Sequence, residues 1–108
     1  MHKQLSVAEA VLLLEQGAVL IDVREPSEIS AGRAPQAITN TLQTFDIALV
    51  PTDCELVIVC RVGVRSNAVA QALTQAGYTA HNLAGGMNAW EAAGQPVINA
   101  DGATGYIA

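Results

Sequence analysis

A cysteine stands at the one place in this sequence where an apolar run meets a loop that contains both glycine and arginine. Residues 56–59 read LVIV, Cys60 follows, and Arg61 and Arg65 lie within five positions of it. The segment after Ser66 has the apolar spacing of a helix. A strand, a tight loop and a helix N-terminus in this order bring backbone N–H groups and the positive end of the helix dipole toward the sulfur. Such a setting favours the thiolate, which is the nucleophilic form of cysteine.

The residues after the cysteine supply a candidate binding loop for an anion. Gly63 permits the unusual backbone angles that a ring of inward-pointing N–H groups requires. An arginine at a helix N-terminus is unfavourable by about 0.3–1 kcal/mol, which favours a role for both arginines in binding an anion. Ser66 is interpreted as a helix cap, with a hydrogen bond to the sulfur as the alternative. We therefore predict that Cys60 is the nucleophile. We predict that the substrate-binding loop consists of Arg61, Val62, Gly63, Val64, Arg65 and Ser66.

Three stretches of the sequence resemble the rhodanese-type sulfurtransferases. Residues 60–66, CRVGVRS, are similar to that family's active-site signature, often C-x-x-G-x-R-S. Residues 22–28, DVREPSE, resemble its D-V-R-E-x-x-E segment, and LAGGMNAW at residues 83–90 with GQPV at 94–97 resembles its L-x-G-G-x-x-x-W…G-x-P-V ending. The stretches occur in the family's order. One departure is GRAPQA at residues 32–37, where the family usually reads G-H-I-P-G-A, so no role of that histidine passes to Arg33.

The resemblance implies the transfer of sulfane sulfur. The Cys60 thiolate would attack the outer sulfur of a donor such as thiosulfate, sulfite would leave, and a persulfide would form on Cys60. A second nucleophile would then remove the sulfur, which is ping-pong covalent catalysis. The implied partners are a small anionic sulfur donor and a thiol or cyanide acceptor, with a protein that carries a persulfide as a further alternative. The resemblance implies no metal and no organic cofactor.

Two other function classes are compatible with a cysteine loop of this kind. The first is a phosphatase or arsenate reductase of the related cell-cycle type, which has five residues between its cysteine and arginine. Only four residues separate Cys60 from Arg65, and the smaller ring suits a sulfur atom better than a tetrahedral oxyanion. The second is a catalytically idle binding module of the same fold. Cys60 argues against it, because inactive modules commonly lack that residue.

Apolar runs alternate with helical patterns along the chain, which predicts an α/β fold with a parallel sheet. The resemblance implies a rhodanese-like version, with a central parallel sheet of about five strands flanked by helices on both faces. Ligands in such sheets bind outside the carboxyl ends of the strands, where Cys60 falls. We expect strands at residues 3–5, 19–23, 37–40, 56–59 and 79–83, and helices at residues 7–16, from 26, at 44–49, from 67 to 76 and at 87–93.

Two charged residues lie in or next to an otherwise apolar strand. Asp22 ends the run VLID at residues 19–22, and Arg24 follows two positions later. A buried acid must be paired or lie at the end of its strand. We therefore predict that Asp22 and Arg24 form a structural ion pair or a hydrogen-bond network beneath the active-site loop.

Composition bounds the remaining possibilities. The chain has 108 residues, 51% of them hydrophobic and 14% charged, with a net charge of −5. We expect one domain over residues 1–108, with 101–108 as a loose tail. The net negative charge argues against a nucleic-acid partner.

No targeting signal or membrane-spanning run is recognised in the sequence, which favours a location in the cytoplasm. Roughly 20 Å of extended chain between Cys54 and Cys60 argues against a disulfide, and the histidines fit no zinc spacing.

Overall fold

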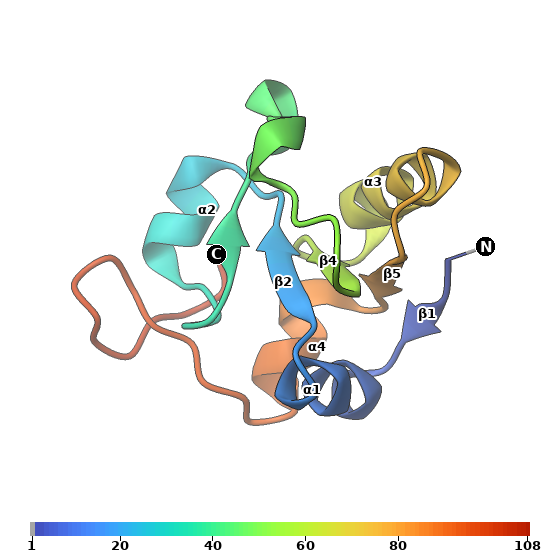
Figure 1. Cartoon of the computed structure of the whole chain (residues 1–108). Coiled ribbons are helices and arrows are strands. Elements are labelled where there is room, and N and C mark those ends of the chain that lie inside the picture. The colour runs from blue at the N-terminus through green and yellow to red at the C-terminus, as the bar shows by residue number, and fades with distance from the viewer. Residues whose placement is uncertain (1) are drawn as a thin grey trace.

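The computed structural model describes residues 2–108, and a five-stranded parallel sheet forms its centre (Figure 1). The strand order is β1-β5-β4-β2-β3, and every neighbouring pair is parallel. The α/β fold and the five-stranded parallel sheet expected from the sequence are confirmed. The strands are β1 (Gln4–Leu5), β2 (Val19–Asp22), β3 (Ile38–Thr39), β4 (Leu56–Val59) and β5 (Ala80–Leu83).

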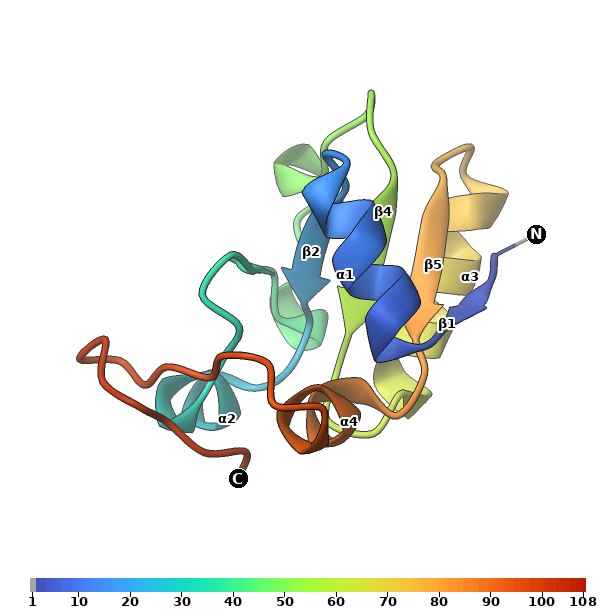
Figure 2. The same cartoon turned by 90° about the horizontal axis from the view of Figure 1, so that it is seen from below.

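Helices cover both faces of the sheet, as expected. The helix α1 lies on the opposite face from α3, and α4 lies on the same side as α1 (Figure 2). Within residues 2–108 the longest helix has 12 residues, and none has the length and apolar character to cross a membrane. The helices are α1 (Val7–Glu15), α2 (Pro26–Ala31), α3 (Val64–Gln75) and α4 (Gly86–Ala92).

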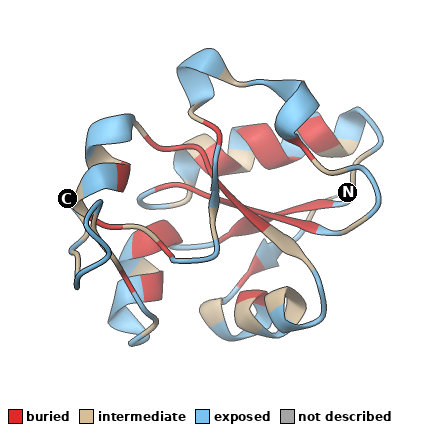
Figure 3. Ribbon diagram, turned by 60° about the vertical axis from the view of Figure 1, so that its left-hand side comes forward, coloured by how far each residue is buried: buried red, intermediate tan, exposed pale blue. Residues whose placement is uncertain are grey.

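The strand β4 lies in the middle of the sheet and divides the core into two layers. Its residues Val57 and Val59 pack with α1 and α4, whereas Leu56, Ile58 and the following Cys60 pack with α3. All of β4 is buried, as the red strands in Figure 3 show. A strand covered on both faces explains why its sequence is a continuous apolar run instead of an alternating one.

The helix expected at residues 44–49 is wrong. Two separate short 3-10 turns, Leu42–Thr44 and Ile47–Leu49, occupy this region. The physical reason is the buried Asn40, whose side chain donates to the carbonyl of Asp46 and accepts from its N–H, both at 3.0 Å. These two bonds hold the backbone of Asp46 to Asn40, so it cannot take part in a continuous helix.

The end of the chain also differs from expectation. Instead of forming a loose tail, residues 101–108 pack back against the turn after α2. The N–H of Tyr106 donates to the carbonyl of Ala31 at 3.0 Å, and the N–H of Gly105 donates to Val97 at 2.9 Å. Ile98 forms isolated bridges with both Arg33 and Thr104. The backbone of Arg33 therefore anchors the C-terminal segment beside α2.

Candidate functional site

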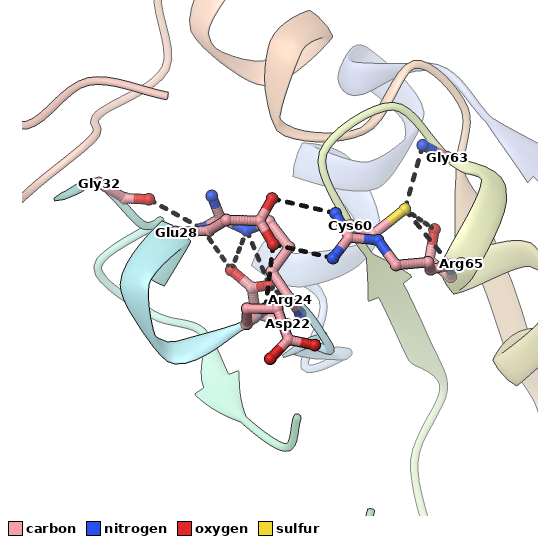
Figure 4. A network of polar contacts seen from close by, with 9 residues as sticks. Asp22, Arg24, Glu28, Gly32, Cys60, Gly63 and Arg65 are labelled. Atoms are coloured by element: carbon pink, nitrogen blue, oxygen red, sulfur yellow. Dashed lines mark hydrogen bonds and ion pairs between the residues drawn. The ribbon is translucent and has the colours of Figure 1, made fainter. Parts of the chain in front are cut away.

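Cys60 follows β4 directly, and three hydrogen-bond donors surround its buried sulfur (Figure 4). The N–H of Gly63 lies 3.2 Å from Sγ, and the N–H of Ser66 lies 3.3 Å from it. The Ser66 hydroxyl oxygen lies 3.2 Å from Sγ. The loop at residues 60–66 thus forms a small ring of donors centred on the sulfur.

The backbone of this ring depends on the residue before α3. Gly63 has a φ of +100°, which is the left-handed region that glycine adopts without strain. The chain then enters α3, whose first N–H groups have no partner within the helix. Ser66 lies in this first turn, so its N–H is free to donate to Sγ. The sequence therefore directs free N–H groups at the sulfur because a glycine permits the turn and a helix begins immediately after it.

Burial and hydrogen bonding act in opposite directions on the pKa of Cys60. Burial is the largest single influence and raises the pKa, because it disfavours the charged thiolate. Hydrogen bonds from the Ser66 hydroxyl and from the N–H groups of Ser66, Gly63 and Val62 together outweigh it and hold the pKa below its usual value. The thiolate favoured from the sequence thus depends on loop donors more than on the arginines.

The N-terminus of α4 holds the other side of the loop. The N–H of Met87 donates to the carbonyl of Cys60 at 2.8 Å, and the N–H of Asn88 donates to the carbonyl of Arg61 at 3.0 Å. This approach requires glycine at position 86. A Cβ atom there would lie 2.3 Å from the carbonyl oxygen of Cys60, and Gly86 has a φ of +58°. Gly86, the first residue of α4, therefore lets this helix approach the cysteine loop closely enough to donate hydrogen bonds to it.

The two loop arginines differ in their surroundings. The guanidinium of Arg65 donates to both carboxylate oxygens of Glu28, at 2.8 and 3.0 Å. This hydrogen bond lowers the pKa of Glu28 and raises the pKa of Arg65, so both groups stay charged. Arg61 is exposed, and no ion pair links its side chain to another of residues 2–108. Glu28 thus balances the positive charge of Arg65, whereas the positive charge of Arg61 has no such partner among residues 2–108.

The pair formed by Arg65 and Glu28 spans the place where the strand order reverses. From β2 the chain moves to one side, to β3, and from the neighbouring β4 it moves to the other side, to β5. Glu28 lies in the helix after β2 and Arg65 in the helix after β4. Ligands of parallel α/β sheets bind in the crevice at such a reversal. The cysteine loop therefore lies in the crevice where the topology predicts a site.

Asp22 and Arg24 form the ion pair that was expected from the sequence. The Nη2 atom of Arg24 lies 2.7 Å from Oδ2 of Asp22, and both side chains are buried. The same Nη2 donates to the carbonyl of Gly32 at 2.8 Å (Figure 4). These bonds join the end of β2 to the end of α2 and do not contact the cysteine loop. The pair therefore supports the helix that carries Glu28, and acts on the loop only through that helix.

Sequence reasoning missed the partners that hold the predicted loop residues. In the sequence, Glu28 and Gly86 stand out only as members of motifs. Asn82 was not noted, although its strand is buried along its whole length. A buried amide needs hydrogen-bond partners, so this signal was present in the sequence. The side chain of Asn82 contacts Ser66, Gly63 and Gln4.

The site offers thiol chemistry from its own residues. Cys54 and Cys60 are both free cysteines. Across residues 2–108, no three side chains of His, Cys, Asp or Glu gather in a way that could hold a metal ion. A buried sulfur whose pKa is lowered by surrounding N–H donors can act as a nucleophile, and the same donors can receive a negatively charged group.

Comparisons with known proteins agree with this geometry. The family description "Rhodanese-like domain" matches residues 6–93. A sulfurtransferase of Allochromatium vinosum is 36% identical over 90 residues, which cover 81% of this chain and 84% of that protein. YtwF of Bacillus subtilis, named as a candidate sulfurtransferase, is 39% identical over 84 residues, covering 71% and 77%. A rhodanese-related protein of Thermoplasma volcanium has the same fold, with a TM-score of 0.82 at 24% identity over 90% of this chain and 98% of that one.

Proposed function

This chain belongs to the rhodanese-like domain family, and we propose that it is a sulfurtransferase that carries sulfane sulfur as a persulfide on Cys60. The single observation that supports this mechanism best is the ring of donors on a buried sulfur. Gly63 and Ser66 direct three donors at Sγ within 3.3 Å. Such donors stabilise negative charge on sulfur in the way that an oxyanion hole stabilises it on oxygen.

The reaction has two balanced steps. In the first, the Cys60 thiolate attacks the outer sulfur of thiosulfate or a related donor. A new S–S bond forms, the old S–S bond breaks, and its electron pair leaves with sulfite. In the second, a thiol or cyanide attacks the outer sulfur of the persulfide, and the electron pair of the broken bond returns to Sγ as the thiolate. The chain's own loop residues hold the charge in both steps.

The exposed Arg61 is the group that meets an anionic donor. Arg65 already has its charge balanced by Glu28, and its role is to hold the loop beside α2. Arg61 follows the nucleophile directly, and its side chain has no ion-pair partner among residues 2–108. A thiosulfate dianion therefore docks through Arg61, and the N–H groups of Val62, Gly63 and Ser66 receive the charge.

Both cysteines are free thiols, which suits the reducing cytoplasm. The proposed partners are small sulfur donors and thiol acceptors, and a protein persulfide is included among the donors. Val62 and Val64 are 48% and 74% exposed, so the loop is accessible both to a small sulfur donor and to a protein persulfide.

Intact mass spectrometry tests the mechanism. After incubation with thiosulfate and removal of the excess, we expect the protein to gain the mass of one sulfur atom, and cyanide should remove it as thiocyanate. Cys60→Ser should abolish the gain. Cys54→Ser is the matched control, because it changes the other cysteine in the same way, and it should keep the gain. An unchanged mass in the native protein with every donor, together with hydrolysis of an aryl phosphate through Cys60, would favour phosphatase chemistry instead.

A further inference from the structure

The hydroxyl of Ser66 has two acceptors within reach and only one proton. Its oxygen lies 3.2 Å from Sγ of Cys60 and 2.6 Å from Oδ1 of Asn82. Ser66 is completely buried and Asn82 is 2% exposed, so water does not supply a second donor. A serine hydroxyl donates one hydrogen bond at a time. The sulfur and the amide oxygen therefore compete for the same proton.

The orientation of the Asn82 amide is fixed by the backbone. Its Nδ2 lies 3.1 Å from the carbonyl oxygen of Gly63, which accepts hydrogen bonds and never donates them. The same nitrogen donates to Oε1 of Gln4 at 2.7 Å. A flipped amide would place an oxygen against the carbonyl of Gly63. Oδ1 must therefore face Ser66, and it is satisfied only when the Ser66 hydroxyl donates to it.

We propose that Asn82 is a positioning residue that draws the Ser66 proton away from Cys60 whenever Sγ is uncharged. With the thiol, the hydroxyl donates to Asn82, and its oxygen accepts the S–H of Cys60. With the thiolate, the hydroxyl turns to Sγ and leaves the buried Oδ1 of Asn82 without a donor. Asn82 thus opposes the stabilisation that Ser66 gives to the thiolate.

This competition has a consequence in the catalytic cycle, which rests on the proposed function. When the persulfide forms, the negative charge moves from Sγ to the outer sulfur, and Sγ becomes neutral. The Ser66 hydroxyl then returns to Asn82. Asn82 therefore favours the persulfide over the free thiolate, and it keeps the thiolate from becoming so stable that it attacks the donor slowly, since nucleophilicity falls as a thiol becomes more acidic.

The pH dependence of Cys60 alkylation tests the proposal without any sulfur donor, so its outcome is separate from that of the mass experiment. In a Cys54→Ser background, Asn82→Leu and Asn82→Ala should both lower the pH midpoint of Cys60 alkylation by about 0.5–1 pH unit. In these variants the amide oxygen no longer competes with the Cys60 thiolate for the Ser66 proton. Ser66→Ala should raise the midpoint, and the rise should be larger in the Asn82→Ala background. Gln71→Ala, which removes an exposed amide from α3, should leave the midpoint unchanged.

The direction of the shift separates positioning from damage to the fold. A loop that is merely loosened loses the N–H groups of Gly63 and Ser66 from the sulfur, and its alkylation midpoint moves up. A raised midpoint in both Asn82 variants would overturn the proposal. Equal effects of Ser66→Ala with and without Asn82 would also overturn it, because competition for one proton requires the two changes to be non-additive.

Discussion

The two terminal nitrogens of Arg65 face the two carboxylate oxygens of Glu28, at 2.8 and 3.0 Å, between helices that follow neighbouring strands. This fork-to-fork geometry is the strongest form of a surface ion pair and depends on the flat shape of the guanidinium. The pair is partly exposed, with side chains 33% and 18% accessible. The pair joins the start of α3 to α2, so we expect it to contribute by holding the donors around Cys60 in position.

Arg65→Lys should lower sulfur transfer for all donors alike. Lysine keeps the charge but cannot form the two-pronged contact with Glu28, so the loop loses its fixed position. We expect kcat/KM to fall on the order of tenfold for both thiosulfate and a monoanionic persulfide donor, as for one lost charge-assisted bond. Glu28→Gln should show the same pattern. A loss confined to thiosulfate would mean that Arg65 binds the donor's charge directly, as the sequence had suggested.

Arg61→Ala should weaken the use of thiosulfate selectively. The exposed guanidinium attracts the dianion, so kcat/KM for thiosulfate should fall on the order of tenfold while a monoanionic donor is affected less. Added salt should shrink the difference, because exposed charges are screened. Arg33→Ala is the control, since it removes the same charge beside the C-terminal segment. If the two variants behave alike, net charge and not Arg61 governs docking.

Alkylation of Cys60 should rise with pH and reach half its maximal rate below the usual thiol value of about 8.5. The sign follows from the lowered pKa of Cys60: above it the thiolate predominates, and below it the rate falls about tenfold for each pH unit. Iodoacetamide labelling of the Cys54→Ser protein, followed by mass, measures this. A midpoint at or above that of a free thiol would show that burial outweighs the loop donors.

Gly86→Ala should damage the site and the fold together. The added methyl would lie 2.3 Å from the carbonyl of Cys60, so α4 must move away from the loop. Gly94→Ala is the matched control, because Gly94 has a similar positive φ with nothing within 4 Å of the added atom. The control should cost about 1–2 kcal/mol of backbone strain, and Gly86→Ala clearly more. Urea unfolding and persulfide mass compare the two, and equal stabilities would disprove the close approach.

Arg24→Met should destabilise the protein by about 3–5 kcal/mol, because it leaves the buried carboxylate of Asp22 without its partner. Urea unfolding measures this. Adding Asp22→Asn to the same protein should recover part of the loss, since no unpaired charge then remains in the core. A cost near zero for the single variant would show that water reaches Asp22 when the arginine is removed.

Structure that depends on neighbouring residues could be predicted from the sequence, whereas contacts between residues far apart in the chain could not. The capping box of Ser6 and Glu9, with bonds of 2.9 and 3.1 Å, is a local feature of this kind, because both partners lie within one turn. The loop after Cys60 follows equally from adjacent residues. Glu28, in contrast, lies 37 positions from Arg65, and only the sheet order brings them together.

The errors have the same physical origin. The C-terminal segment has little sequence pattern of its own, and it is ordered by backbone bonds to Ala31 and Val97, which no pattern indicates. The helix expected at residues 44–49 does not form, because the side chain of Asn40 hydrogen-bonds the N–H and carbonyl groups of Asp46. Asn82 could have been noted from its buried strand, but its partners could not, because Ser66 and Gln4 come from separate elements.

The cysteine peptide is attached to helices on both faces of the sheet. Its sulfur accepts hydrogen bonds from Gly63 and from Ser66 in α3, while its carbonyl accepts one from Met87 in α4. The donors therefore stand in place before any charge arrives. In an unattached loop, part of the binding free energy of an anion would be consumed in turning these dipoles toward it. Here the backbone N–H groups were oriented when the chain folded, so in the proposed reaction only the Ser66 hydroxyl has to turn as charge moves between Sγ and an outer sulfur.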